Sequence, residues 1–238
     1  MLVIDGVSKN FGGLTALYEV SFEVKKGEIV GLIGPNGAGK TTLFEIISGF
    51  MRPTSGIVLF EGDRIDGLQP HQVLKRGLAR SFQEVQVFPS FTAYQNILVS
   101  ALHSLPMSEA SKRTEEILEL VGLSSKAKLP APMLTLPDQK AVELGKVLAL
   151  EPRLILLDEV MAGLTEVEAE NMIALIRRLW KQGITFLLVE HRMEIVTELC
   201  QRIVVLNFGM KIAEGATDEV MRNKDVVESY LGEEISSA

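Results

Sequence analysis

Cysteine is almost absent from this chain, since Cys200 is the only one among 238 residues. A disulfide bond within the chain is therefore excluded, and the composition favours a reducing compartment. Because a lone cysteine most often packs as a small apolar side chain, we expect Cys200 to be buried on a helix over residues 194–200. With one cysteine and three histidines, the sequence also offers no cysteine and histidine cluster for a transition metal.

An excess of basic residues is missing as well, because 24 Lys and Arg stand against 31 Asp and Glu, a net charge of −7. Proteins that neutralise nucleic-acid phosphates are expected to be basic, so we expect no nucleic-acid partner. No apolar run approaches the roughly 20 residues that cross a bilayer. Met1–Asp5 lacks both a basic region and a long apolar segment, so we expect no export signal. The protein should reach a membrane only through a partner.

What the chain does have is a glycine-rich loop at residues 34–42. Its residues are Gly34, Pro35, Asn36, Gly37, Ala38, Gly39, Lys40, Thr41 and Thr42. The preceding residues 28–33 predict a buried strand and residues 42–47 a helix, which is the setting of a phosphate-binding loop. Glycines let successive N–H groups face phosphate oxygens at a helix N-terminus. Lys40 can reach the β- and γ-phosphates and Thr41 can bind Mg²⁺, so we predict a nucleoside triphosphate site.

A second motif lies at the end of an apolar run, residues 154–157, which is followed by Asp158 and Glu159. Open α/β sheets bind ligands at the carboxyl ends of their strands. Asp158 is therefore placed to hold Mg²⁺. Glu159, one residue later, is the candidate that polarises the attacking water.

The hydrophobic pattern predicts one α/β domain with a helical insertion. Short apolar runs separated by turn residues over 2–33 predict an antiparallel, hairpin-like entry. A mostly parallel sheet should follow, because apolar strands alternate with helices from residue 154 onward. The expected strands are 2–4, 16–24, 29–33, 57–60, 78–82, 154–157, 184–189 and 202–206, and the expected helices are 42–47, 70–77, 92–102, 108–121, 138–150, 166–181 and 194–200. We place the core at 1–84 and 151–238 and the helical subdomain at about 85–150.

With both motifs in this order, the chain resembles the ATP-binding-cassette (ABC) ATPases over essentially its whole length. The supporting positions are Phe11 for the adenine ring, Gln83 between core and helical subdomain, Leu134–Asp138 at the signature pentapeptide, Ala162–Thr165 at the dimer-contact loop, and His191 at the switch histidine. Each is weak alone; their joint order carries the resemblance. It implies a P-loop NTPase core that hydrolyses ATP with Mg²⁺. It assigns catalysis to Lys40, Gln83, Glu159 and His191, nucleotide contacts to Phe11, Gly34–Thr42 and Thr135, and metal binding to Thr41, Gln83 and Asp158.

The signature departs from the family pattern, because Leu-Ser-Gly-Gly-Gln is here Leu134-Thr135-Leu136-Pro137-Asp138. Thr135 keeps a hydroxyl that could donate to a γ-phosphate. Pro137 removes a backbone N–H, and Asp138 adds negative charge where a partner's nucleotide should lie. Thr165 also stands where the contact loop usually has Asp or Asn. The family implies a head-to-tail pair, so we hypothesise unequal sites in a heterodimer.

Within the family, the resemblance is to the ATPase subunits of branched-chain amino-acid importers. It rests on residues 11–17, 79–89, 160–164, 215–220 and 226–232. The implied partners are a second ABC ATPase subunit, as a homo- or heterodimer, and integral membrane permease subunits. The implied location is cytoplasmic, on the inner face of the cell membrane. A lipid or lipopolysaccharide transporter and a non-hydrolysing regulatory cassette remain alternatives.

The permease contact is expected near Gln83, where Phe82, Phe88, Phe91 and Tyr94 cluster in sequence. These aromatic residues could equally form the core of the helical subdomain.

Overall fold

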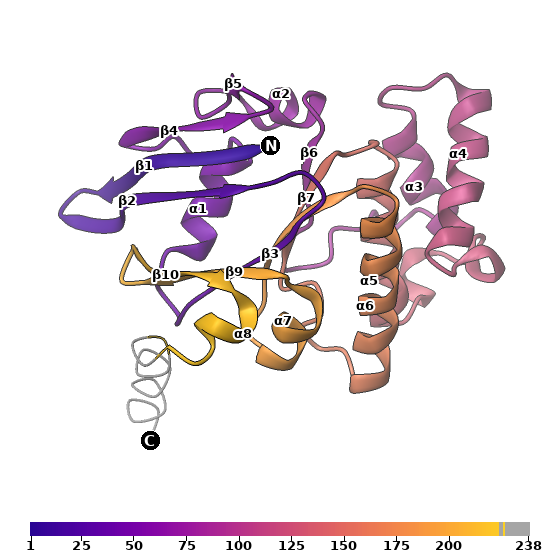
Figure 1. Ribbon diagram of the computed structural model, residues 1–238. Coiled ribbons are helices and arrows are strands. Elements are labelled where there is room, and N and C mark those ends of the chain that lie inside the picture. The colour runs from indigo at the N-terminus through magenta and orange to yellow at the C-terminus, as the bar shows by residue number, and fades with distance from the viewer. Residues whose placement is uncertain (224–225, 227–238) are drawn as a thin grey trace. The chain divides into compact units, whose positions relative to one another are not determined.

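The computed structural model describes residues 1–223 and residue 226. The chain forms two compact units, Met1–Leu78 with Thr185–Ala238, and Ala79–Ile184 (Figure 1). The tail at 232–238, and the stretch 226–232 apart from Val226, lie outside the described residues. The division into core and helical subdomain at residues 84 and 150 stays a prediction.

The first unit contains an antiparallel sheet in the order β2-β1-β4-β5. Its strands are β1 (Leu2–Phe11), β2 (Leu14–Val24), β4 (Ser55–Phe60) and β5 (Asp63–Arg64). β1 pairs antiparallel with both β2 and β4, and the three strands lie side by side in Figure 1. Leu2 and Ile4 are buried, as alternation along a one-sided strand requires, and Val7 is buried after a shift in register between Ile4 and Val7. The predicted antiparallel entry is confirmed.

The same unit contains strands that are mostly parallel. β3 (Ile29–Ile33) pairs parallel with β8 (Thr185–Val189) on one side and β9 (Arg202–Asn207) on the other, and β10 (Met210–Ala216) runs antiparallel to β9. Every residue of β3 and β8 is buried, which is typical of a parallel sheet covered on both faces. The helices of this unit are α1 (Lys40–Ile47), α2 (Pro70–Lys75), α7 (Met193–Leu199) and α8 (Thr217–Val220).

Cys200 follows α7 and is buried, as the sequence predicted. Its burial, with a smaller contribution from Glu190, raises the pKa of the thiol to about 12. A Cβ added to Gly31 of β3 would lie 3.0 Å from its sulfur, so the thiol fills space between strand and helix.

The second unit contains β7 (Leu154–Asp158) beside β6 (Leu78–Arg80), whose first residue belongs to the first unit. Its helices are α3 (Ala93–Ala101), α4 (Met107–Leu120), α5 (Leu136–Leu148) and α6 (Glu166–Lys181), with 3₁₀ turns η1 (Ser124–Lys126) and η2 (Ala131–Met133). The three helices predicted between residues 92 and 150 are present. β6 ends at Arg80 rather than at Phe82, so Gln83 follows a short loop.

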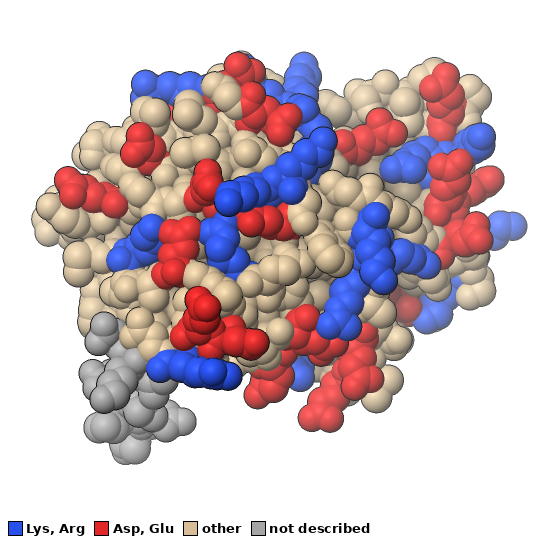
Figure 2. All heavy atoms as spheres, viewed as in Figure 1, with Lys and Arg blue, Asp and Glu red and all other residues tan. Residues whose placement is uncertain are grey.

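Charges of both signs are interspersed on the surface. Figure 2 shows Lys and Arg among Asp and Glu on the face in view.

Candidate functional site

The phosphate loop joins the buried strand β3 to the helix α1. Gly34 has a φ of +152° and Gly39 a φ of +101°. A Cβ at Gly34 would lie 2.1 Å from the carbonyl oxygen of Leu206, and one at Gly39 would lie 2.6 Å from Cδ2 of Leu17. Both positions therefore require glycine for two reasons, the left-handed backbone and the close approach of neighbouring chain.

Lys40 is the buried cation of the loop. Its side chain folds back, and Nζ donates to the carbonyl oxygens of Gly34 at 2.6 Å and Pro35 at 2.9 Å. The backbone N–H of Ala38 donates to the Pro35 oxygen at 3.1 Å, which tightens the turn. Thr41 is exposed and Thr42 is half-buried. The loop thus holds an ammonium group and a hydroxyl where the motif places a triphosphate and its metal.

The aromatic ring of Phe11 lies at the end of β1, in the same unit as the loop. Its residue is 46% exposed, which is high for a phenylalanine. The Nζ of Lys9 lies 5.2 Å from the ring centroid, so a cation already contacts the ring. An exposed ring next to a cation suits a planar nucleobase, the role that the family implies.

Asp158 and Glu159, at the end of β7, are held by the last residue of β6 and by the segment that follows it. Asp158 is buried, and its Oδ2 lies 2.6 Å from Nη2 of Arg80. Nε2 of Gln83 donates to Oε2 of Glu159 at 2.8 Å. The structure therefore brings together Gln83 and Glu159, which the sequence assigned to one catalytic group, and adds Arg80.

Arg80 was missed as a site residue by sequence reasoning. The available signal was a charged side chain that ends a short buried strand, three residues before Gln83. The adjacent Phe82 donates its backbone N–H to Oε1 of Glu143 at 2.8 Å. Burial raises the pKa of Glu143 above its usual value, against that hydrogen bond and the charges of Lys146 and Lys140.

The polar side chains of the signature segment and of Lys126 bind one another. The hydroxyl of Thr135 donates to Oδ2 of Asp138 at 2.8 Å, and Nζ of Lys126 lies 2.7 Å from both carboxylate oxygens. Burial alone would raise the pKa of Asp138, but the hydrogen bonds from Lys126 and Thr135 hold it below the usual value. The hydroxyl that the sequence offered to a γ-phosphate is engaged within its own helix cap. We name Lys126, Thr135 and Asp138 the signature clasp.

His191 follows β8 and is exposed, directly after the buried Glu190. It lies in the first unit with the phosphate loop, whereas Asp158, Glu159 and Gln83 lie in the second. Its role as a switch histidine stays a proposal.

The donor chemistry of the predicted metal ligands fits Mg²⁺. Thr41 offers a hydroxyl, Gln83 an amide oxygen and Asp158 a carboxylate, all hard oxygen donors. Across the described residues, no group of three or more His, Cys, Asp and Glu forms a cage for a metal ion. That agrees with Mg²⁺, which binds through one or two protein ligands, water and substrate phosphates.

A phosphate loop on β3–α1, with acidic residues ending an apolar strand, defines a P-loop nucleoside triphosphatase. Residues 17–162 match the family model described as ABC transporter, and residues 210–236 match the one described as branched-chain amino acid ATP-binding cassette transporter. The chain belongs to the ABC transporter ATPases, in the branched-chain amino-acid group. Enzymes of this family couple ATP hydrolysis to transport.

Known relatives agree along the whole chain. The high-affinity branched-chain amino acid transport ATP-binding protein LivG of Escherichia coli K12 is 37% identical over 250 residues, 98% of each chain. The ADP conformation of MJ1267, an ATP-binding cassette of an ABC transporter, has a TM-score of 0.89 and 32% identity over 98% of each chain. MJ0796, seen as a dimer in a post-hydrolysis state with ADP and phosphate, has a TM-score of 0.81 and 26% identity over 91% of this chain and 99% of that one.

In the part of the chain that the structure describes, no helix is both long and apolar enough to cross a membrane.

Proposed function

We propose that this chain is the ATP-hydrolysing subunit of a membrane importer for branched-chain, hydrophobic amino acids. The observation that carries the cargo class is the match of residues 210–236 to the branched-chain amino-acid cassette model. The likeness to LivG over 98% of both chains supports it. The proposed ATP hydrolysis is supported by a phosphate loop in which every motif position is filled.

Each site residue has a distinct part in the proposed reaction. The N–H groups of Gly34–Thr42 bind the phosphates, Lys40 neutralises charge on the β- and γ-phosphates, and Phe11 stacks on the adenine. Mg²⁺, held through Thr41, Gln83 and Asp158, would offset charge on the phosphate oxygens. Glu159 accepts a proton from the attacking water, and the amide of Gln83 sets the direction of its carboxylate. His191 contacts the γ-phosphate end of the site.

We further propose that hydrolysis needs two cassettes and that the two sites are unequal. In a head-to-tail pair, this chain offers its signature helix to the partner's nucleotide. The signature clasp presents a carboxylate there, and Pro137 has no N–H to give. The partner that suits this chain is therefore a different cassette with a complete signature, which would serve the nucleotide bound by Lys40.

The permease is proposed to bind the second unit near Gln83, which would place the protein at the inner face of the cell membrane. Phe82 is 37% and Phe88 46% exposed, so neither is a core residue. The rings of Phe88 and Phe91 lie 5.4 Å apart, and Nζ of Lys146 lies 5.0 Å from the Phe88 centroid. This exposed aromatic surface supports a contact with a short cytoplasmic helix.

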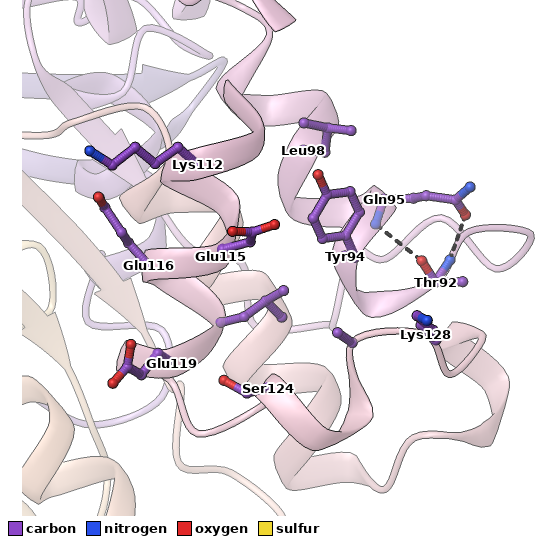
Figure 3. A pocket seen from close by; sticks show the side chains of 12 residues that line it. Thr92, Tyr94, Gln95, Leu98, Lys112, Glu115, Glu116, Glu119, Ser124 and Lys128 are labelled. Atoms are coloured by element: carbon purple, nitrogen blue, oxygen red, sulfur yellow. Dashed lines mark hydrogen bonds between the residues drawn. The ribbon is translucent and has the colours of Figure 1, made fainter. Parts of the chain in front are cut away.

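The second unit also contains a cavity of about 940 Å³ between α3, α4 and η1 (Figure 3). Tyr94 and Leu98 line it from α3, and Glu115, Glu116 and Glu119 line it from α4. Lys112 and Lys128 also line the cavity, so its charges are mixed with an excess of negative charge, and this rim beside apolar side chains suits an amphipathic helix that carries basic residues.

The test is transport by the complete complex in proteoliposomes, with labelled leucine as cargo. Glu159→Gln should lower ATP hydrolysis at least about 100-fold and keep ATP affinity, because only the base is lost. Phe88→Asp should abolish uptake and keep ATP affinity, because only the permease contact is lost. Glu84→Gln, at an exposed neighbouring position, is the matched control and should behave as wild type.

Three outcomes would overturn this proposal. Absence of hydrolysis by the wild-type complex would favour a regulatory cassette. Uptake of a lipid instead of leucine would favour a different cargo. Loss of ATP binding in Phe88→Asp would favour a role in the packing of the second unit.

A further inference from the structure

Residues 80–83 lie alongside the end of β7 and contact it almost residue by residue. The N–H of Ser81 donates to the oxygen of Leu156 at 2.9 Å, and the N–H of Asp158 donates to the hydroxyl of Ser81 at 3.3 Å. This register places Arg80 against Asp158 and Gln83 against Glu159. One short segment therefore controls both carboxylates of the strand.

The contact between Arg80 and Asp158 is a buried ion pair. The side chains are 8% and 7% exposed, and Nη2 lies 2.6 Å from Oδ2. A carboxylate this far from water is strongly unfavourable unless a positive charge accompanies it. Arg80 supplies that charge.

The guanidinium of Arg80 also has a second contact. Its carbon Cζ lies 5.3 Å from the ring centroid of Phe82, within the range of a cation–π interaction. If the guanidinium leaves the carboxylate, the aromatic ring still offers it a favourable position.

We propose that Arg80 is a positioning residue that competes with Mg²⁺ for Asp158. The inference rests on the proposed role of Asp158 as a metal ligand. Arg80 holds and orients the Asp158 carboxylate through the ion pair, and Mg²⁺ that arrives with ATP must displace it. Arg80 thereby lowers the gain in nucleotide affinity that Mg²⁺ provides. Because Gln83 lies on the same segment, the exchange also reaches the hydrogen bond that directs Glu159.

The experiment measures the dissociation constant of ATP for the full chain in EDTA and in Mg²⁺, by calorimetry. The ratio of the two constants is the magnesium factor, and it cancels the general effect of a charge change on ATP. Arg80→Gln should raise this factor about tenfold, because Asp158 then lacks a competing cation. Arg80→Lys keeps the charge without the planar fork and should raise it less, about threefold.

Arg64→Gln is the matched control. Arg64 also forms an ion pair with a buried carboxylate, its Nε lying 2.9 Å from Oδ1 of Asp66, and neither residue is assigned to the nucleotide site. Its removal should leave the magnesium factor unchanged. Electron paramagnetic resonance of Mn²⁺ with ATP provides a second readout, since tighter metal binding in Arg80→Gln should lower the free Mn²⁺ signal.

The outcomes separate this inference from the proposed function. An unchanged or smaller magnesium factor in Arg80→Gln would overturn the competition and make Arg80 a purely structural partner or an aid to metal binding. If Arg80→Gln does not fold, a factor in Arg80→Lys at or below that of wild type overturns it equally. A wild-type chain whose ATP affinity does not respond to Mg²⁺ would instead remove the metal role of Asp158.

Discussion

Two helices carry the chemistry of a cassette at their N-termini, and in this chain their first turns are built in opposite ways. Among the described residues, α1 receives no side-chain cap and has no acidic residue in its first turn, and Gly39 precedes it. α5 begins with a reciprocal cap between Thr135 and Asp138, with proline in its first turn. No side chain of the described residues caps the start of α1, whereas at the start of α5 the hydroxyl of Thr135 accepts from the N–H of Asp138.

The two helix starts belong to two different nucleotide sites in the proposed pair of cassettes. The phosphate loop belongs to its own nucleotide, and every element of that loop is present. In the proposed pair, the signature would serve the nucleotide of the partner, and the clasp would stand there in place of phosphate-binding donors. A subunit can therefore preserve full catalytic chemistry on its own ATP while it weakens the other site of the pair.

The largest effect is expected at the start of α1, which has no side-chain cap among the described residues. Lys40→Ala should lower ATP affinity at least about 100-fold, because it removes the buried ammonium that faces the phosphates and frees the carbonyl oxygens of Gly34 and Pro35. Calorimetric titration with ATP and Mg²⁺ measures it. Lys75→Ala, at an exposed lysine in the last turn of α2, should bind ATP as wild type does. Equal losses in both variants would contradict a specific role for Lys40.

Features encoded by contiguous residues could be predicted from the sequence, whereas features that depend on pairing between distant segments could not. The phosphate loop is contiguous, so its residues, its strand and its helix could be predicted together. α6 was predicted with its observed bounds, Glu166–Lys181, and the structure shows that Thr165 caps its start. The edge strand β10 (Met210–Ala216) was missed because its side chains are exposed or half-buried, and only pairing with β9 defines it.

Interactions that depend on how two strands align could not be predicted from the sequence. Arg80 and Asp158 lie 78 residues apart along the chain. Their ion pair depends on the alignment of β6 with β7, and no local pattern encodes that alignment. The cap of α5 was nearer to prediction, since Thr135 and Asp138 have the spacing of a capping box, whereas Lys126 joins it only through the fold.

A smaller effect is expected when the first turn of α5 is changed to the usual residues of the family signature. Pro137→Gly with Asp138→Gln should raise hydrolysis at the partner's site about tenfold, because a backbone N–H returns and a carboxylate leaves. The rate is measured in the assembled complex with Glu159→Gln in this chain, so that only the partner's nucleotide is hydrolysed. Pro70→Gly, which changes a proline in the first turn of α2, should have no effect. An unchanged rate in the double variant would reject the hypothesis of unequal sites.

The smallest effect concerns the stability of the clasp. Asp138→Asn should lower the free energy of unfolding at neutral pH by about 1 kcal/mol, because the asparagine cannot pair with Lys126. The pKa of Asp138 is lowered in the folded chain, so the carboxylate stabilises the protein above the unfolded value, about 3.9. That contribution disappears as the pH falls through the lower folded pKa.

Urea unfolding across a pH series measures the difference between wild type and Asp138→Asn. The difference should stay constant from neutral pH to about pH 5 and shrink as the pH falls to 4 and below. Asp63→Asn is the control, because Asp63 is largely exposed and its carboxylate lies 3.8 Å from Arg76. A difference that persists unchanged at the lowest pH would mean that the cap acts through its shape and not through the charge of Asp138.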